Sequence, residues 1–233
     1  MFLQERLHQA EQLDNFELSG PALRRTLLEL QRINYLFGNV RTLSNAVMKE
    51  IENLQIATVK IIDLGCGSGD VLAAIARKAR RKGITVELCG IDGNPHSLAF
   101  GRECWAAFPE LQFQEEDIMA DQFALPACDI LISSHFLYHF PDEALVSFLD
   151  KQLQAVGHAA IFSELDRHFL ALHLFKFVSL LLGFSPITRK DGQTAVRRAF
   201  RQKELAQIVA KVEFKRSRLQ YKWAFRHLLS IYK

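Results

Sequence analysis

One acidic residue is followed by three glycines at alternate positions: Asp63, Gly65, Gly67 and Gly69. Such a loop lets the backbone turn sharply and approach a ligand that any β-carbon would exclude. The residues just before it, 59–62, are mostly β-branched and predict a short strand buried on both faces. A dinucleotide fingerprint spaces its glycines as G-x-G-x-x-G. The alternate spacing therefore predicts a different kind of ligand-binding loop, placed between a strand and a helix.

Two further acids follow the next predicted strands. Asp92 lies in the run Cys-Gly-Ile-Asp-Gly-Asn, and Asp117 lies in Glu-Glu-Asp-Ile. Ligands of open α/β sheets bind at the carboxyl ends of strands, where both acids are expected. A carboxylate at position 92 can accept hydrogen bonds from both hydroxyls of a ribose; taken alone, Asp92 could equally be an acid at a helix start. Acidic surroundings suit a cationic ligand and would repel a pyrophosphate.

The combination of the glycine loop with Asp63, Asp92 and Asp117 resembles the motifs of the class I S-adenosylmethionine-dependent methyltransferases, over about residues 55–165. This resemblance implies an enzyme with S-adenosylmethionine as its cofactor. It implies that the loop contacts the amino acid and sugar portions, Asp92 the ribose, and Asp117 with Ile118 the adenine. The cofactor-binding residues implied in this way are Asp63, Gly65, Cys66, Gly67, Gly69, Asp92, Gly93, Asp117, Ile118, Ser133 and Ser134.

Two outer segments, Glu11–Leu43 and Glu164–Phe200, are similar to a bacterial subgroup of small-molecule methyltransferases of polyketide and phenolic-lipid pathways. That similarity implies a small-molecule acceptor.

The loop after the fourth predicted strand reads Ser-Ser-His-Phe from Ser133 to Phe136. In the family, the residues here lie near the transferable methyl group. Enzymes that methylate amino groups of nucleic acids usually carry an Asn/Asp-Pro-Pro-aromatic motif at this place. Its absence argues against adenine or cytosine as the acceptor. Oxygen, carbon and small-molecule nitrogen acceptors remain open.

Histidines near these strand ends are the expected proton acceptors. A base is needed if the acceptor is a protonated hydroxyl, since a phenol titrates near pH 10. Histidine suits that task because its pKa lies near the working pH. His139 is the first candidate, followed by His135 and His168, although each could be a hydrogen-bonded core histidine. Tyr138, Asp166 and Arg167 are expected to contact the acceptor. The alternative for Tyr138 is packing in the core, and the alternative for Asp166 and Arg167 is an acid at a helix start followed by a solvated cation.

The net charge of +3 is unevenly distributed, because residues 186–233 carry +10 and the preceding residues −7. The basic region is either a solvated face or a patch for an anionic partner: a carrier-bound substrate, a membrane surface or nucleic acid. The apolar stretch Phe169–Phe184 is too short to span a bilayer comfortably. It predicts a core helix, or else an apolar lid over the acceptor or a contact with a membrane surface.

Strands and helices alternate along most of the chain, which indicates the α/β class with a parallel sheet. Strands are expected at 59–64, 85–91, 111–115, 128–133 and 157–163, and helices at 70–82, 95–107 and 142–155. A last helix near 201–211 and one long strand near 214–225 would complete the sheet. With the resemblance, the expected fold is Rossmann-like, a doubly wound, seven-stranded, mostly parallel sheet with an N-terminal helical cap.

The length predicts a single methyltransferase domain over 1–233. It divides into a cap (1–57), a cofactor-binding core (58–165), and acceptor-side helices with C-terminal strands (166–233). Four cysteines lack metal-ligand spacing and are expected to be reduced. No metal is expected. No secretory signal is visible at the start, so the expected location is cytoplasmic.

The favoured function is methyl transfer to a small, largely apolar acceptor, with O-methylation of a phenolic or enolic hydroxyl as the preferred case. The alternative is an RNA or protein methyltransferase that docks through the basic C-terminal region; the acceptor loop disfavours nucleic acid. A silent cofactor-binding scaffold would be expected to lose Asp92 or the glycines, which are intact. Peripheral membrane contact is a further expectation of the apolar and basic segments.

Overall fold

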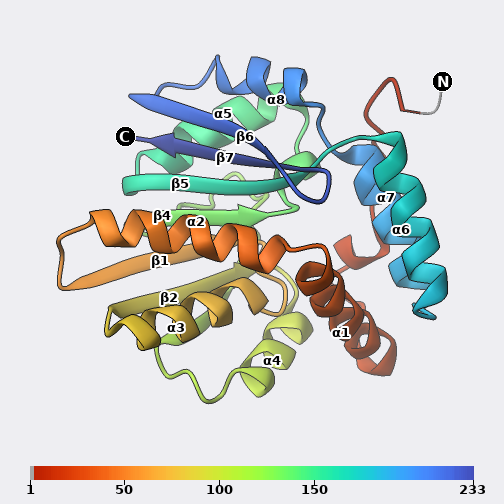
Figure 1. Ribbon diagram of the computed structural model, residues 1–233, viewed down its shortest axis with the longest axis horizontal. Coiled ribbons are helices and arrows are strands. Elements are labelled where there is room, and N and C mark those ends of the chain that lie inside the picture. The colour runs from red at the N-terminus through yellow and green to blue at the C-terminus, as the bar shows by residue number, and fades with distance from the viewer. Residues whose placement is uncertain (1–2) are drawn as a thin grey trace.

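A seven-stranded sheet occupies the centre of the structure, a computed structural model that describes residues 3–233 (Figure 1). The strands lie in the order β3-β2-β1-β4-β5-β7-β6. The first five pair in parallel, and β7 is antiparallel to both of its neighbours. The predicted doubly wound, mostly parallel, seven-stranded sheet is therefore confirmed. Its strands are β1 (Thr58–Leu64), β2 (Thr85–Asp92), β3 (Leu111–Glu115), β4 (Cys128–Ser134), β5 (Val156–Leu165), β6 (Arg216–Lys222) and β7 (Arg226–Tyr232).

Helices cover both faces and one edge of the sheet. Along β1, Ile61 and Ile62 alternate between the faces, so the strand has a packed layer on each side. One face is covered by α2 and α3, and the other by α5 and α8. The helices are α1 (Gly20–Leu36), α2 (Asn39–Asn53), α3 (Asp70–Lys82), α4 (Pro95–Cys104), α5 (Asp142–Leu153), α6 (Phe169–Leu181), α7 (Pro186–Arg198) and α8 (Gln202–Val209), with short 3-10 turns at Gln12–Asp14 and Leu137–His139.

In the N-terminal part of the chain, α2 packs on the sheet beside α3 through residues such as Leu43 and Val47. Only α1 and residues 3–19, here called the strap, extend beyond the sheet in this part of the chain. Figure 1 shows α1, α6 and α7 together at the edge of the sheet where the parallel strands end. The ring of Phe175 on α6 packs against Ile33 of α1, and against Gly192 of α7, where a β-carbon would meet that ring at 2.1 Å.

The strap is held across this edge by arginines and a carboxylate. Arg6 donates hydrogen bonds to the carbonyls of Tyr138, Phe140 and Arg198. Arg167 donates to the carbonyls of Leu3 and Gln4. The carboxylate of Asp191 on α7 accepts from the backbone amides of Gln12 and Leu13, each at 3.0 Å. These contacts fix the strap over the ends of β1, β2 and β4.

The single long strand expected near 214–225 is wrong, because the chain turns at Trp223–Phe225 and returns as β7. This turn contains no glycine, proline or asparagine, and Phe225 itself adopts a positive φ of 51°. The usual sequence signal for a turn is therefore missing.

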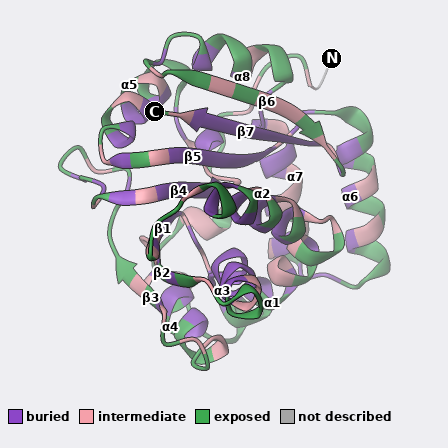
Figure 2. Ribbon diagram, turned by 60° about the vertical axis from the view of Figure 1, so that its left-hand side comes forward, coloured by how far each residue is buried: buried purple, intermediate pink, exposed green. Residues whose placement is uncertain are grey.

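None of the helices that the structure describes over residues 3–233 is long and apolar enough to cross a membrane. Figure 2 shows that the buried residues concentrate in the strands and on the helix sides that face them.

Candidate active site

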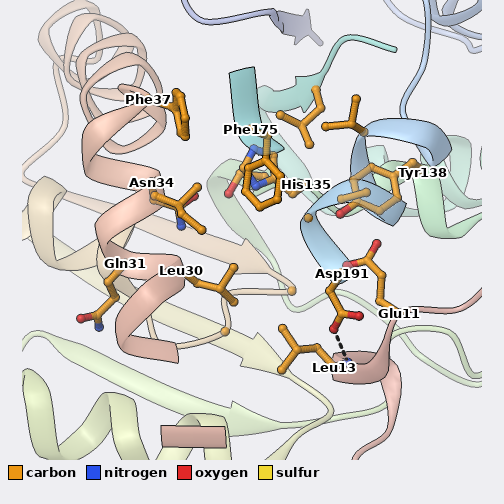
Figure 3. A pocket seen from close by; sticks show the side chains of 18 of the residues that line it. Glu11, Leu13, Leu30, Gln31, Asn34, Phe37, His135, Tyr138, Phe175 and Asp191 are labelled. Carbon is orange, nitrogen blue, oxygen red and sulfur yellow. Dashed lines mark hydrogen bonds between the residues drawn. The ribbon is translucent and has the colours of Figure 1, made fainter. Parts of the chain in front are cut away.

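Two adjoining hollows lie at the carboxyl ends of the parallel strands. The first, called the inner cavity, has a volume of about 260 Å³ and lies among the glycine loop, α1, α6 and α7 (Figure 3). The second, called the outer hollow, has a volume of about 350 Å³ and lies beside the ends of β2 and β3. Both are lined by Leu13, Asp14, Gly65, His135 and His139, so they form one continuous site.

The glycine loop forms the boundary between the two hollows. Gly65, Gly67 and Gly69 all have positive φ angles, between 54° and 75°. A β-carbon on Gly65 would lie 2.7 Å from the ring of Phe136. The amide of Gly67 donates to Asp92 Oδ2 at 2.8 Å, so the loop is tied to the second strand. The predicted residues Gly65, Cys66 and Gly67 line the inner cavity.

Two buried carboxylates lie at the loop end of the inner cavity. Asp63 is 2% exposed, and its Oδ1 has no hydrogen-bond partner. Burial, with the neighbouring charges of Asp70 and Asp92, raises its pKa well above the usual value. Burial also raises the pKa of Asp70 to about 6, although Asn34 Nδ2 of α1 donates to it at 2.9 Å. No described cation contributes to the pKa shift of either group, so this end of the cavity favours a cationic ligand.

The outer hollow collects the predicted residues from the ends of β2 and β3. Asp92, Gly93, Asp117 and Ile118 all line it. Asp92 Oδ1 accepts from the amide of Asn94 at 2.9 Å, which leaves lone pairs on both oxygens for a ligand. Sequence reasoning missed Phe16 of the strap, whose ring lies on Gly93 so closely that a β-carbon there would meet it at 2.4 Å.

The two serines at the end of β4 have different positions. Ser133 is fully buried, and its hydroxyl donates to the carbonyl of Leu64 at 2.7 Å. It lines neither hollow. Ser134, on the next residue, lines the inner cavity.

His135 and His139 both line the two hollows, and both are neutral near pH 7. Arg226 Nη1 donates to His135 Nε2, and burial together with this cation lowers the pKa of His135 well below its usual value. Arg198 Nη2 donates to His139 Nδ1 at 3.1 Å. Burial lowers the pKa of His139 to about 4, an effect that Asp14 opposes and Arg198 adds to. The ring of Tyr138, another predicted contact, stacks on His139 and lines the inner cavity.

The structure does not bring His168, Asp166 or Arg167 into either hollow. His168 caps α6, with its Nδ1 accepting from the amide of Leu170. Asp166 pairs with the buried His227 at 3.2 Å. Arg167 is 2% exposed, forms an ion pair with Glu204 and holds the strap. Its contacts make it a positioning residue for the strap.

Five charged residues of the inner cavity were not predicted: Glu11, Asp14, Asp70, Asp191 and Arg226. Burial, with Asp14 as the next cause, raises the pKa of Glu11 to about 8, while Arg198 opposes the shift. Figure 3 shows Glu11, Asp191 and Tyr138 on one side of the cavity and α1 on the other. Arg226 is 1% exposed, its Nε has no partner, and burial lowers its pKa to about 10.

Apart from Gln31, Asn34 and Ser68, the remaining side chains that line the inner cavity are apolar. They comprise Leu27, Leu30, Ile33, Phe37, Leu165, Ala171, Leu174, Phe175, Ala195, Val196, Ala224 and Phe225. The site therefore combines a carboxylate-lined end, a few polar groups around His135, and an apolar compartment between three helices.

Residues 61–157 match a family model described as a methyltransferase domain. No curated protein sequence matches the chain. Solved structures of similar fold include the magnesium protoporphyrin IX methyltransferase of Synechocystis PCC 6803 with bound SAH, which aligns over 84% of this chain and 84% of its own at 17% identity and a TM-score of 0.56. Human N-acetylserotonin methyltransferase in complex with SAM aligns over 91% of this chain and 55% of its own, at 15% identity and a TM-score of 0.63. The plantazolicin methyltransferase with SAH aligns over 91% and 94%, at 14% identity and a TM-score of 0.62.

At these identities the structural likeness concerns the fold, and the domain match concerns the segment around the glycine loop. The structural likeness confirms the predicted fold, and the domain match indicates a methyltransferase domain over residues 61–157.

Proposed function

We propose that this chain is an S-adenosylmethionine-dependent methyltransferase that methylates a hydroxyl oxygen of a small, largely apolar acceptor. The observation that carries the proposal is the composition of the inner cavity. Its loop end holds Asp63 and Asp70 without a cation, whereas most of the wall that α1, α6 and α7 contribute consists of apolar side chains. A charged donor and an apolar acceptor would thus meet at Gly65.

The described residues fit the cofactor. The unpartnered carboxylate of Asp63 and the raised pKa of Asp70 suit its positive charge. Asp92 would accept from the ribose hydroxyls, and Asp117 would lie near the adenine amine. When bound, the cofactor supplies a sulfonium-linked methyl group that a nucleophile displaces in line. The chain's main task is then to position the acceptor and exclude water.

Arg226 and His135 are the groups that suit an acceptor oxygen. The guanidinium is buried, has an unpartnered Nε and lines the cavity. A cation beside a phenolic or enolic hydroxyl favours the ionised form and so lowers the pKa of that hydroxyl. Because Arg226 holds Nε2 of His135, the proton of this neutral ring lies on Nδ1, from which it can donate.

Glu11 is a stronger proton acceptor than the histidine that the sequence favours. The pKa of His139 is about 4, and Arg198 occupies its Nδ1 lone pair. Moving a proton from a phenol of pKa near 10 to His139 would cost about 8 kcal/mol, but to Glu11, with a pKa of about 8, only about 3 kcal/mol. We therefore assign Glu11 as the base and leave His139 as a residue that contacts the acceptor.

The basic C-terminal region gives little support to the alternative of an RNA or protein acceptor. Two of its arginines, Arg198 and Arg226, are buried and line the hollows, so their charge serves the site.

Solved structures of similar fold include a putative O-methyltransferase from Nostoc punctiforme and a carbon methyltransferase, CurJ. The choice of oxygen therefore rests on the residues of this cavity.

The test is methyl transfer from labelled S-adenosylmethionine to matched apolar acceptors: a phenol, the corresponding aniline and the methyl ether of the phenol. We expect the phenol to yield its methyl ether, the aniline to react at least tenfold more slowly, and the ether to act only as an inhibitor. Mass spectrometry locates the new methyl group. Transfer to carbon or nitrogen in preference to oxygen would contradict the proposal.

A further inference from the structure

Helix α6 carries large apolar side chains on its solvent side as well as on the side that packs against the protein. Its inner side places Ala171, Leu172 and Phe175 in buried positions. Its outer side presents Phe169, Phe177, Leu180 and Leu181, which are 58%, 65%, 68% and 70% exposed. A surface helix normally carries polar residues on its solvent face. The outer face of α6 therefore lacks a covering partner in the described chain (Figure 2).

The turn between β6 and β7 extends this apolar face. Trp223 in this turn is 73% exposed. Phe225, two residues later, stacks on His168 at the start of α6, with ring centroids 5.1 Å apart. Figures 1 and 2 both show the turn beside this end of α6. We call Trp223 and the outer face of α6 the apolar patch. Contiguous exposed patches of this kind mark interaction surfaces.

The charged side chains that α6 and the turn between β6 and β7 carry are positive. Residues 168–190 contain Lys176, Arg189 and Lys190 and no acid. Residues 214–233, which form β6, the turn and β7, contain six cations and no acid. Of these, Lys176 and Lys190 are exposed and Lys222 is half-buried. The surface that complements the patch must therefore be apolar within and negatively charged at its boundary.

We propose that the chain docks on anionic lipid bilayers through the apolar patch. A bilayer offers an apolar interior to the phenylalanine and leucine side chains and an interfacial layer that suits Trp223. Its anionic headgroups attract Lys176 and Lys222. A second copy of the chain fits less well, because a two-fold contact would bring the same cations of both copies together.

Docking through this patch would also define the acceptor more closely, a step that rests on the proposed function. The helix that carries the patch lines the inner cavity with Leu174 and Phe175, and the turn lines it with Phe225. The wall of the acceptor compartment is therefore the same element that would meet the lipid. We infer that the acceptor is a lipophilic hydroxyl compound dissolved in the bilayer.

Binding is tested by flotation of the full chain with vesicles of phosphatidylcholine alone and of phosphatidylcholine with phosphatidylglycerol at 3:1. We expect partitioning onto the anionic vesicles to be at least tenfold stronger, and to weaken with added salt. The tryptophan emission should shift to the blue on binding, and Trp223→Phe should abolish the shift while Trp105 remains. A chain that stays unbound at both compositions would overturn the proposal.

Two variants distinguish lipid binding through the apolar patch from nonspecific adsorption of the protein to lipid. Phe177→Glu/Leu181→Glu should reduce binding at least tenfold, and Lys176→Glu/Lys222→Glu should remove the preference for anionic lipid. The matched control is Ile56→Glu, an exposed apolar position just before β1 and therefore at the opposite edge of the sheet. Circular dichroism checks that each variant folds. Equal loss in the control, or a dimer that the patch variant breaks without any lipid binding, would also overturn the proposal.

The inference that the acceptor is dissolved in the bilayer is tested separately, by methylation rates. Anionic vesicles should raise the methylation rate of a vesicle-dissolved alkyl phenol at least fivefold for the unmodified chain, and not for Phe177→Glu/Leu181→Glu. The rate with a short water-soluble phenol should be the same for both. If neither phenol reacts, the proposed function fails, whereas the flotation result still decides the docking.

Discussion

The carboxyl group of Asp63 shows how a single residue selects the ligand of this site. It is buried, one oxygen has no partner, and its nearest influential neighbours are two more carboxylates. In the ligand-free protein, burial favours the protonated form of such a carboxyl group. A bound positive charge would favour the ionised form instead. The unfavourable burial of these carboxylates is therefore consistent with a site that binds a cationic cofactor.

This arrangement predicts that affinity for S-adenosylmethionine depends on pH through Asp70. Because burial raises the pKa of Asp70 to about 6, the carboxyl is protonated below that pH and must ionise to meet the positive charge. We expect the dissociation constant to rise about tenfold from pH 7 to pH 5, measured by titration calorimetry. S-adenosylhomocysteine, which lacks the sulfonium charge, serves as the control. The prediction fails if the affinity ratio of the two ligands is the same at pH 5 and pH 7.

At Glu11 the expected result is a change in both rate and pH profile. Glu11→Gln should lower kcat with a phenolic acceptor by about 10²-fold, the usual contribution of a general base. The loss should shrink as pH approaches 10, because the phenol then ionises without help. His139→Gln is the matched variant and should change kcat by less than tenfold. If His139→Gln instead causes the larger, pH-dependent loss, the assignment of the base is reversed.

Among the elements, the strap decides the shape of the site. It supplies Glu11 and Asp14 to the inner cavity and Phe16 to the outer hollow. It is only residues 3–19 of the chain, and its position depends on Arg167, Asp191 and Arg6. An element with so few buried side chains is expected to open more readily than the sheet. The strap is therefore a natural place for ligand entry.

For the strap we predict that Phe16→Ala weakens cofactor binding without weakening the fold. Its ring is 45% exposed, lies on Gly93 and lines the hollow expected to receive the adenine. Loss of one aromatic contact should lower affinity about two- to tenfold. Phe177→Ala, on the outer side of α6, is the matched control and should leave affinity unchanged. Calorimetry and thermal unfolding of both variants give the comparison; equal affinities would contradict the role of Phe16.

The strand-end residues were predictable because their signals are local. The run from Asp63 to Asp70, and the positions of Asp92 and Asp117, follow from strand, turn and helix patterns within a few residues. The face of a strand residue was harder to assign, since a shift of one position reverses it. This explains why Ser134 lines the cavity while Ser133 bonds to a neighbouring strand.

Contacts between distant segments could not be predicted from the sequence. Asp191 meets the strap across more than 170 residues, and Arg226 reaches the cavity only because an unsignalled turn begins β7. Nothing in the local pattern around Glu11 indicates that it will line the inner cavity. These residues are placed by tertiary packing, which one sequence does not specify position by position.

Across the whole molecule, the buried ionisable groups of the site lower the free energy of unfolding of the ligand-free protein. Groups whose pKa is lowered by folding and groups whose pKa is raised by folding do so in different pH ranges. His135 and His139 are held neutral, so their burial opposes folding only below their ordinary pKa of about 6.5. Buried carboxylates with raised pKa values oppose folding as pH rises through the range in which they ionise. Between about pH 6.5 and 8 the histidines contribute no further change, and the carboxylates dominate.

In that window we predict that the ligand-free chain becomes less stable as pH rises. The pKa of Glu11 is raised from 4.5 to about 8, so the folded state holds a proton there that the unfolded state has lost. From pH 6.5 to 8 this single group should lower the free energy of unfolding by about 2 kcal/mol, and Asp63 should add to the fall. Urea unfolding at the two pH values measures the change, and Glu11→Gln should remove about 2 kcal/mol of it. Saturating S-adenosylmethionine should reduce the part due to Asp63, because its positive charge favours the ionised carboxylate. A free energy that stays constant or rises over this range would mean that these carboxyls are already ionised in the ligand-free fold.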